Sequence, residues 1–149
     1  MLASVETLIN KGAPYVFVAN MYPKHIAPVT AVYLCSGYNN ACVETFGQII
    51  SNANAALKEK LAAAYPHKVI YYDSFEYISG LIKNKNSYGF TKSLEVFCDG
   101  DGDASWNDCM VEGHAREYFW MNFVQPTTAV HKLIGQNMKL AIDKHFGFA

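Results

Sequence analysis

Two short apolar runs constrain the fold of this chain more than any other feature of its sequence. "PYVFVAN" (14–20) and "KVIYYD" (68–73) are apolar without alternation, which is typical of strands buried on both faces. Between them, residues 43–64 repeat apolar side chains at helical spacing. The order strand, helix, strand predicts an α/β class with a parallel sheet, in which only two strands are clear.

Three further helical patterns surround these strands. They are a short helix that ends at Gly12, "SFEYISGLIKN" after the second strand, and a final helix opened by Pro126 and Thr127. In the long central helix the residues expected on the buried face are Val43, Phe46, Ile50, Leu57 and Leu61. A parallel sheet of two strands leaves its edges open and is marginal alone. We therefore expect residues 1–149 to form a single domain that is part of a larger α/β fold.

Composition and charge exclude several classes of protein. The 149 residues are 51% hydrophobic, and 12 basic against 13 acidic residues give a net charge of −1. Because no basic stripe occurs, nothing favours a nucleic-acid or anionic-membrane partner. The apolar runs are far shorter than the roughly 20 residues of a membrane-spanning helix. We expect a globular protein without a transmembrane segment.

The four cysteines fall in two close pairs, each in a predicted loop. Cys35 and Cys42 bracket "SGYNNA", and Cys98 and Cys109 bracket "DGDGDASWND". Neither pair has the CxxC spacing of a zinc or redox site, so two local disulfides are expected, which places the protein outside the cytosol. The start "MLASVETLINKG" does not resemble a signal peptide. We therefore expect a secreted protein from which an N-terminal segment is missing.

The stretch "YFWMNFVQPTTAVH" (118–131) resembles the closing motif of the GDSL or SGNH hydrolases, a family of esterases and lipases. That motif has an aromatic pair, an Asp, two variable residues, a His, a Pro and a Thr before a helix. Here Asn122 stands in place of the Asp and Gln125 in place of the His, and every other element matches. Weaker similarities occur in "VFVAN", "VIYYDSFEYI" and "YGFTKSLEVFC".

The resemblance implies a partial flavodoxin-like, three-layer α/β/α fold that corresponds to the C-terminal half of such a hydrolase. The family's nucleophilic serine lies in an N-terminal Gly-Asp-Ser block, and its oxyanion-hole Gly and Asn lie in two later blocks. None of these has a counterpart here. No catalytic residue is therefore expected to be intact.

The two exchanged residues also remove the base chemistry. In a Ser-His-Asp triad the imidazole accepts the serine proton, and the carboxylate stabilises the imidazolium. The Gln125 amide does not titrate in the useful range, and the Asn122 amide carries no charge. Loss of a triad costs several orders of magnitude in rate.

Two functions remain open. The first is a truncated, non-catalytic pseudo-hydrolase with a binding or structural role, as a possible homo-oligomer. The alternative is the C-terminal portion of a secreted serine ester hydrolase, of lipase or carbohydrate acetylesterase type, that is active only with a complementing N-terminal half.

Other candidate residues are better explained structurally. Asp99, Asp101 and Asp103 alternate as in a calcium loop, but Ala104 and Met110 replace the required Gly and Glu, so a solvated acidic loop is favoured. We expect no metal and no cofactor.

Further side chains that could suggest a site also have structural explanations. His131 follows the closing motif, yet a surface or half-buried position in the final helix is expected rather than a role as substitute base. Asp73 ends a strand and precedes a helix, which predicts a helix cap. A core position rather than a ligand platform is expected for five aromatic residues, Tyr15, Tyr71, Tyr72, Phe75 and Tyr77.

Overall fold

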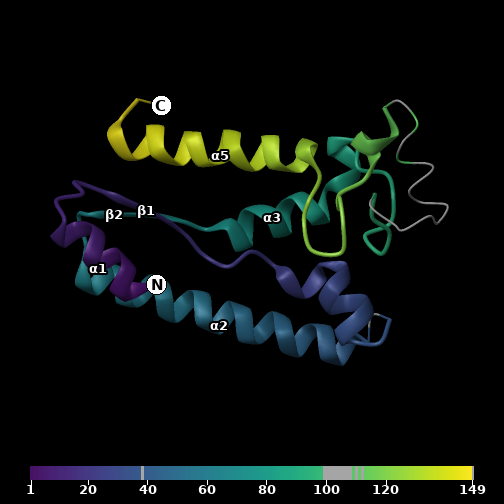
Figure 1. Cartoon of the computed structure of the whole chain (residues 1–149), viewed down its shortest axis with the longest axis horizontal. Helices are drawn as coiled ribbons and strands as arrows, with labels where there is room; N and C mark the ends of the chain where they lie inside the picture. The colour runs from purple at the N-terminus through teal and green to yellow at the C-terminus, as the bar shows by residue number, and fades with distance from the viewer. Residues whose placement is uncertain (38, 99–108, 110, 112, 149) are drawn as a thin grey trace.

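The α/β class predicted from the sequence is confirmed. The computed structural model describes residues 1–37, 39–98, 109, 111 and 113–148. The helices and strands, in chain order, are α1 (Leu2–Asn10), β1 (Val16–Ala19), α2 (Asn40–Ala64), β2 (Val69–Tyr72), α3 (Ser74–Lys83) and α5 (Thr128–Phe146) (Figure 1). Short helical turns are η1 (Lys24–Ile26), the π-helix η2 (Val29–Leu34), η3 (Lys85–Tyr88) and η4 (His114–Glu117).

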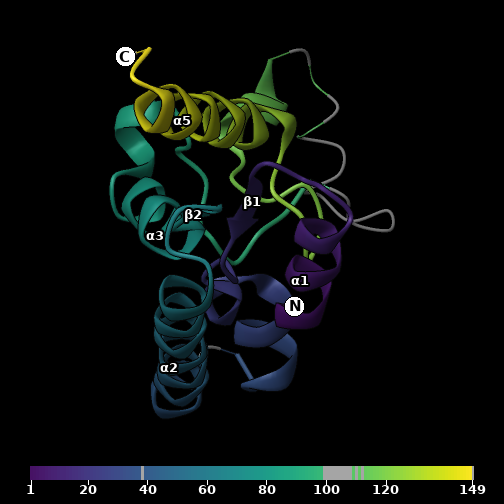
Figure 2. The same cartoon turned by 90° about the vertical axis from the view of Figure 1, so that its left-hand side faces the viewer.

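The two strands form a parallel sheet with helices on both of its faces. Val16 lies opposite Val69 and Ala19 lies opposite Tyr72, with α2 as the connection between the strands. Figures 1 and 2 show α5 on one side of the sheet and α1 and α2 on the other. The carboxyl ends of β1 and β2 therefore lie side by side at one end of this layered arrangement.

Two apolar clusters hold the layers together. Val5 of α1, Val16 and Val18 of β1 and Leu61 of α2 form the smaller cluster. The larger one joins α3 and α5 to the aromatic pair of the closing motif, and its buried members are Ala27, Ile78, Leu81, Phe90, Phe119, Trp120, Val130 and Ile134. The residues just before Asn122 are thus part of the main core.

Two expectations for α2 were wrong. The helix begins at Asn40 rather than Val43, because the Asn39 side chain accepts a hydrogen bond from the Cys42 N–H at 3.1 Å and caps it. Phe46 is 38% exposed instead of buried. The reason is length: a helix of 25 residues spans about 38 Å, whereas strands of four residues span about 13 Å. The first turns of α2 extend beyond the sheet.

Both predicted disulfides are present in the structure. Cys35 joins Cys42 with their Cα atoms 5.5 Å apart, and Cys98 joins Cys109 at 5.3 Å. Disulfides persist in oxidising surroundings, so the two bridges are consistent with an extracellular protein.

No helix within the described ranges combines the length and apolar character that a membrane crossing requires.

We predict that the purified chain has no thiol that alkylates before reduction, and mass spectrometry of the alkylated protein measures this directly. Replacing Cys35 and Cys42 together with alanine should lower the free energy of unfolding by about 2–3 kcal/mol, because the bridge restricts the unfolded chain. Four alkylatable thiols in the unreduced protein would contradict the pairing.

Candidate functional site

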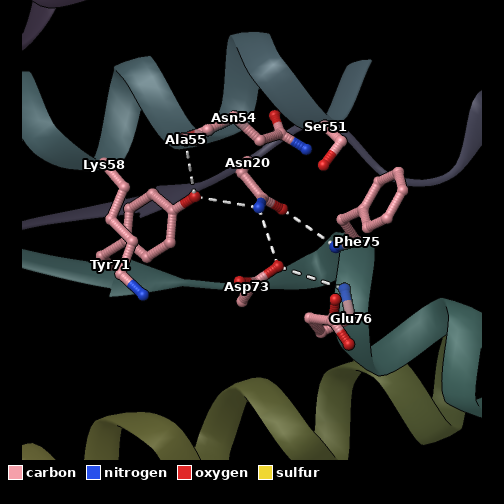
Figure 3. A pocket seen from close by; sticks show the side chains of 9 residues that line it. All are labelled: Asn20, Ser51, Asn54, Ala55, Lys58, Tyr71, Asp73, Phe75 and Glu76. Atoms are coloured by element: carbon pink, nitrogen blue, oxygen red, sulfur yellow. Dashed lines mark hydrogen bonds between the residues drawn. The ribbon is translucent and has the colours of Figure 1, made fainter. Parts of the chain in front are cut away.

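The carboxyl ends of the two strands form a polar site. Asn20 directly follows β1 and Asp73 directly follows β2, and the Asn20 Nδ2 donates to Asp73 Oδ1 at 2.8 Å (Figure 3). In open α/β sheets, ligands bind outside the carboxyl ends of the strands. This end of the sheet is therefore the first candidate for a functional site.

The Asn20 side chain uses both its donors and its acceptor. Its Nδ2 also donates to the Tyr71 hydroxyl at 2.9 Å, and its Oδ1 accepts from the Phe75 N–H at 2.9 Å. The Ser74 Oγ lies 2.9 Å from the same Oδ1. Because Asn20 is only 6% exposed, losing any of these partners would leave a buried polar group unsatisfied. The amide fixes the end of β1 against β2 and the first turn of α3.

Asp73 is the helix cap that the sequence predicted. Its Oδ1 accepts the Glu76 N–H at 3.1 Å, in addition to the Asn20 amide. A carboxylate at a helix N-terminus also interacts favourably with the helix dipole. One oxygen of Asp73 therefore serves the cap and the network, and its second oxygen has no hydrogen bond to any described residue.

Asn54 brings α2 into the site. Its Oδ1 accepts the Met21 N–H at 3.0 Å, and its Nδ2 donates to the Met21 carbonyl at 2.8 Å. This paired contact imitates a main-chain pairing and buries Asn54 to 7% exposure. It fixes the segment that follows β1 against the helix.

A cavity of about 200 Å³ lies between these elements, lined by Asn20, Ser51, Asn54, Ala55, Lys58, Tyr71, Asp73, Phe75 and Glu76 (Figure 3). We refer to it as the edge pocket; it lies at the carboxyl ends of the strands and not along the outer side of either strand. The Ser51 hydroxyl and the Glu76 carboxylate have no hydrogen-bond partner among the described residues. The Lys58 Nζ lies 5.6 Å from the centre of the Tyr71 ring. A hydroxyl, a carboxylate and an ammonium group are therefore available to a ligand.

Two aromatic groups next to the pocket are kept neutral. Burial raises the pKa of the Tyr71 hydroxyl, although its hydrogen bond from Asn20 acts in the opposite direction. Burial lowers the pKa of His25, whose ring stacks on Phe75 with the ring centres 5.7 Å apart. The His25 Nδ1 is buried and has no partner among the described residues.

The closing motif forms a separate turn. The Asn122 Oδ1 accepts the Val124 N–H at 2.9 Å and the Gln125 N–H at 2.7 Å. The Asn122 Nδ2 donates to the Gln125 Oε1 at 3.2 Å. The structure thus brings the two predicted positions together, but as a pair of amides that bond to each other, with Gln125 exposed. Neither group can accept a proton from a nucleophile at neutral pH.

This turn is held against the segment after β1. The Phe123 carbonyl accepts the Val29 N–H at 2.7 Å, and the Tyr22 hydroxyl donates to the Val124 carbonyl at 3.2 Å. Burial raises the pKa of Tyr22. The geometry of the motif is therefore supported from outside the motif.

The remaining predicted positions lie elsewhere. His131 is exposed on α5, as expected for the surface of a helix. Asp99, Asp101 and Asp103 lie outside the described residues. Within the described part of the chain, no group of three or more His, Cys, Asp or Glu side chains is arranged to hold a metal ion.

Sequence reasoning missed Asn20 and Asn54. The signal for Asn20 was present, because a polar residue follows each buried strand and the carboxyl ends of parallel strands meet. Asn54 interrupts the apolar face of a helix and gives no sign of its partner. Comparison with known proteins adds nothing to this assignment: no family model matches the chain, and no curated protein matches it.

We predict that Asn20→Ala lowers the free energy of unfolding by about 2–3 kcal/mol, because buried partners of the amide lose their hydrogen bonds. In Asn20→Asp the introduced carboxyl lies beside Asp73, which raises its folded-state pKa above the unfolded value. That variant should be most stable in acid and lose stability as the pH rises through the raised pKa. Urea unfolding at pH 4 and pH 7 measures both effects.

The matched control is Asn52→Asp, at an exposed position of the same helix as Asn54. It should change stability by less than about 0.5 kcal/mol at either pH. Equal behaviour of the two Asp variants would contradict the role given to Asn20.

Proposed function

We propose that this chain is a secreted, non-catalytic binding module of SGNH-hydrolase-like ancestry, with a partial flavodoxin-like three-layer fold. The resemblance of residues 118–131 to the hydrolase closing motif supports the ancestry. A short parallel sheet with helices on both faces is compatible with the fold. The two disulfides support an extracellular location.

The closing motif supports the absence of catalysis. Asn122 and Gln125 carry amides that hydrogen-bond to each other, so no group there can act as a general base. The sequence contains no Gly-Asp-Ser block to supply the family's nucleophile. The retained residues of the motif therefore maintain structure.

The observation that carries the binding role is the edge pocket. Its framework amides, Asn20 and Asn54, are fully engaged and buried, while Ser51, Lys58 and Glu76 are left to face a ligand. A preorganised pocket loses little entropy on binding. A volume of about 200 Å³ is below the roughly 300–1,000 Å³ of drug-sized sites. We infer a small ligand with several hydroxyl or amino groups, such as a single sugar residue.

The outer edge of β1, with which no described residue pairs, favours a second function, the C-terminal portion of a serine ester hydrolase that needs a complementing N-terminal half. A polypeptide that adds a strand to β1 could supply the serine and the oxyanion donors. The combined site would still have the amide of Gln125 in place of the base. The binding module is therefore the better-supported function.

We predict that glucosamine, titrated into the ¹⁵N-labelled chain, shifts the amide signals of residues 51–58 and 73–76. Ser51→Ala and Glu76→Gln should each weaken binding by about 3- to 10-fold, the effect of one lost hydrogen bond. Ser87→Ala changes an exposed serine outside the pocket and is the matched control. Shifts that both pocket variants leave unchanged, or no shifts at 100 mM sugar, would refute this site.

We also predict that neither the native chain nor the double variant Asn122→Asp/Gln125→His hydrolyses p-nitrophenyl acetate above the buffer rate. The restored base has no recognisable nucleophile, and each missing oxyanion donor costs roughly 10²–10³ in rate. A fluorophosphonate probe should label no serine. Activity of the double variant only when mixed with a polypeptide containing a Gly-Asp-Ser block would favour the hydrolase-half function, and activity of either chain alone would contradict both.

A further inference from the structure

The outer edge of β1 has main-chain groups without a hydrogen-bond partner in the described part of the chain. The Val16 N–H donates to the Lys68 carbonyl at 2.8 Å, and the Asn20 N–H donates to the Tyr72 carbonyl at 3.1 Å. Alternate residues of a strand direct their main-chain groups to opposite edges. Phe17 and Ala19 therefore direct theirs away from β2, and no described residue bonds to them there.

A groove of about 460 Å³ runs beside this edge, lined by Met1, Ser4, Val5, Leu8, Val16, Phe17, Val18 and Ala19. Among the described lining residues none has an ionisable side chain. Leu8 is 48% exposed and Met1 is 65% exposed. Helix α1 contacts β1 and lies toward the viewer in Figure 2. The edge thus combines main-chain groups that no described residue pairs with and a largely apolar surface without ionisable side chains.

The opposite edge, along β2, is protected. It also has a groove, but Lys58 lies over the Tyr71 ring there, and Pro66 is part of its lining. Lys68 directly precedes the strand and is exposed. Lysine and proline are the residues that natural edge strands use to prevent pairing with another chain. Among the described residues that line the groove at the β1 edge there is no lysine or proline.

We propose that two copies of this chain associate through antiparallel pairing of β1 with itself, about a twofold axis at Val18. In this register Phe17 pairs with the partner's Ala19, and Ala19 with the partner's Phe17. Each such pair exchanges two main-chain hydrogen bonds. Every outward-facing group of β1 thereby gains a partner.

The side chains fit this register. Phe17 and Ala19 lie on the same face of the sheet. The pairing therefore places the ring of Phe17 from each copy opposite the methyl group of Ala19 from the other copy. Val18 meets the partner's Val18 on the other face, and β-branched pairs of this kind stabilise sheets. A twofold contact requires one patch that is complementary to itself. The edge meets this requirement, because none of its lining residues places an ionisable side chain in the contact.

The consequence is one continuous sheet across the dimer. Leu8 and Met1 of each copy cover the groove beside the new strand pair, which removes exposed apolar surface from water. The edge pocket lies at the carboxyl end of the strands and does not depend on this contact. The dimer is therefore independent of the proposed ligand.

Sedimentation velocity of the full chain tests the proposal. At about 100 µM protein, the expected species has twice the 16.6 kDa mass of the chain. Leu8→Lys should shift the dissociation constant upward by at least about 10-fold, because it places two charged side chains in an apolar contact. Leu140→Lys, at a 56% exposed leucine of α5, and Ala62→Lys, in the β2 groove, should leave it unchanged.

Hydrogen exchange supplies a second measurement that does not depend on a variant. The amides of Phe17 and Ala19 should become protected as the protein concentration rises through the dissociation constant. Three results would overturn the proposal. The first is a monomer at 100 µM, and the second is a dimer that Ala62→Lys dissociates and Leu8→Lys does not. The third is a dimer in which the amides of Phe17 and Ala19 stay unprotected. The proposal would also be overturned if the chain stays monomeric by itself and its β1 strand pairs only with a polypeptide that carries a Gly-Asp-Ser block.

Discussion

The buried carboxamide of Asn20 is the interaction on which the rest of this structure depends. The two strands have only four residues each, so their ladder is short, and parallel sheets of this size are marginal alone. Asn20 adds contacts to Tyr71, Asp73 and the start of α3, all at the end where the ladder stops. The same contacts orient the walls of the edge pocket. Stability of the sheet and shape of the site thus have one cause.

A second constraint is the burial of the aromatic pair of the closing motif, which explains why the frame of the motif persists without its chemistry. Phe119 and Trp120 are almost fully buried, with their ring centres 5.0 Å apart. Thr127 donates its N–H to the Phe119 carbonyl at 2.9 Å and its hydroxyl to the Tyr118 carbonyl at 3.0 Å. The aromatic pair and the threonine of the motif therefore belong to the core. Positions 122 and 125 lie on the turn between them, where amides cost the fold little.

Local patterns predicted local features well. The two strands, the helices and both disulfides follow from periodicity and cysteine spacing, and Asp73 is the cap that its position between strand and helix indicates. The exposure of Phe46 was not predictable, because helical periodicity gives a face but not the length of the sheet beneath it. The edge pocket was missed because its contacts join residues 53 and 33 positions apart, as in Asn20–Asp73 and Met21–Asn54.

The central claim is that Asn20 preforms the edge pocket before any ligand binds, and side-chain amide exchange measured by NMR tests it most directly. Both Nδ2 protons of Asn20 are hydrogen-bonded and buried, so the account predicts two resolved signals that exchange with solvent much more slowly than those of the exposed Asn52. Exchange of the Asn20 amide as fast as that of Asn52, in the ligand-free chain, would contradict it.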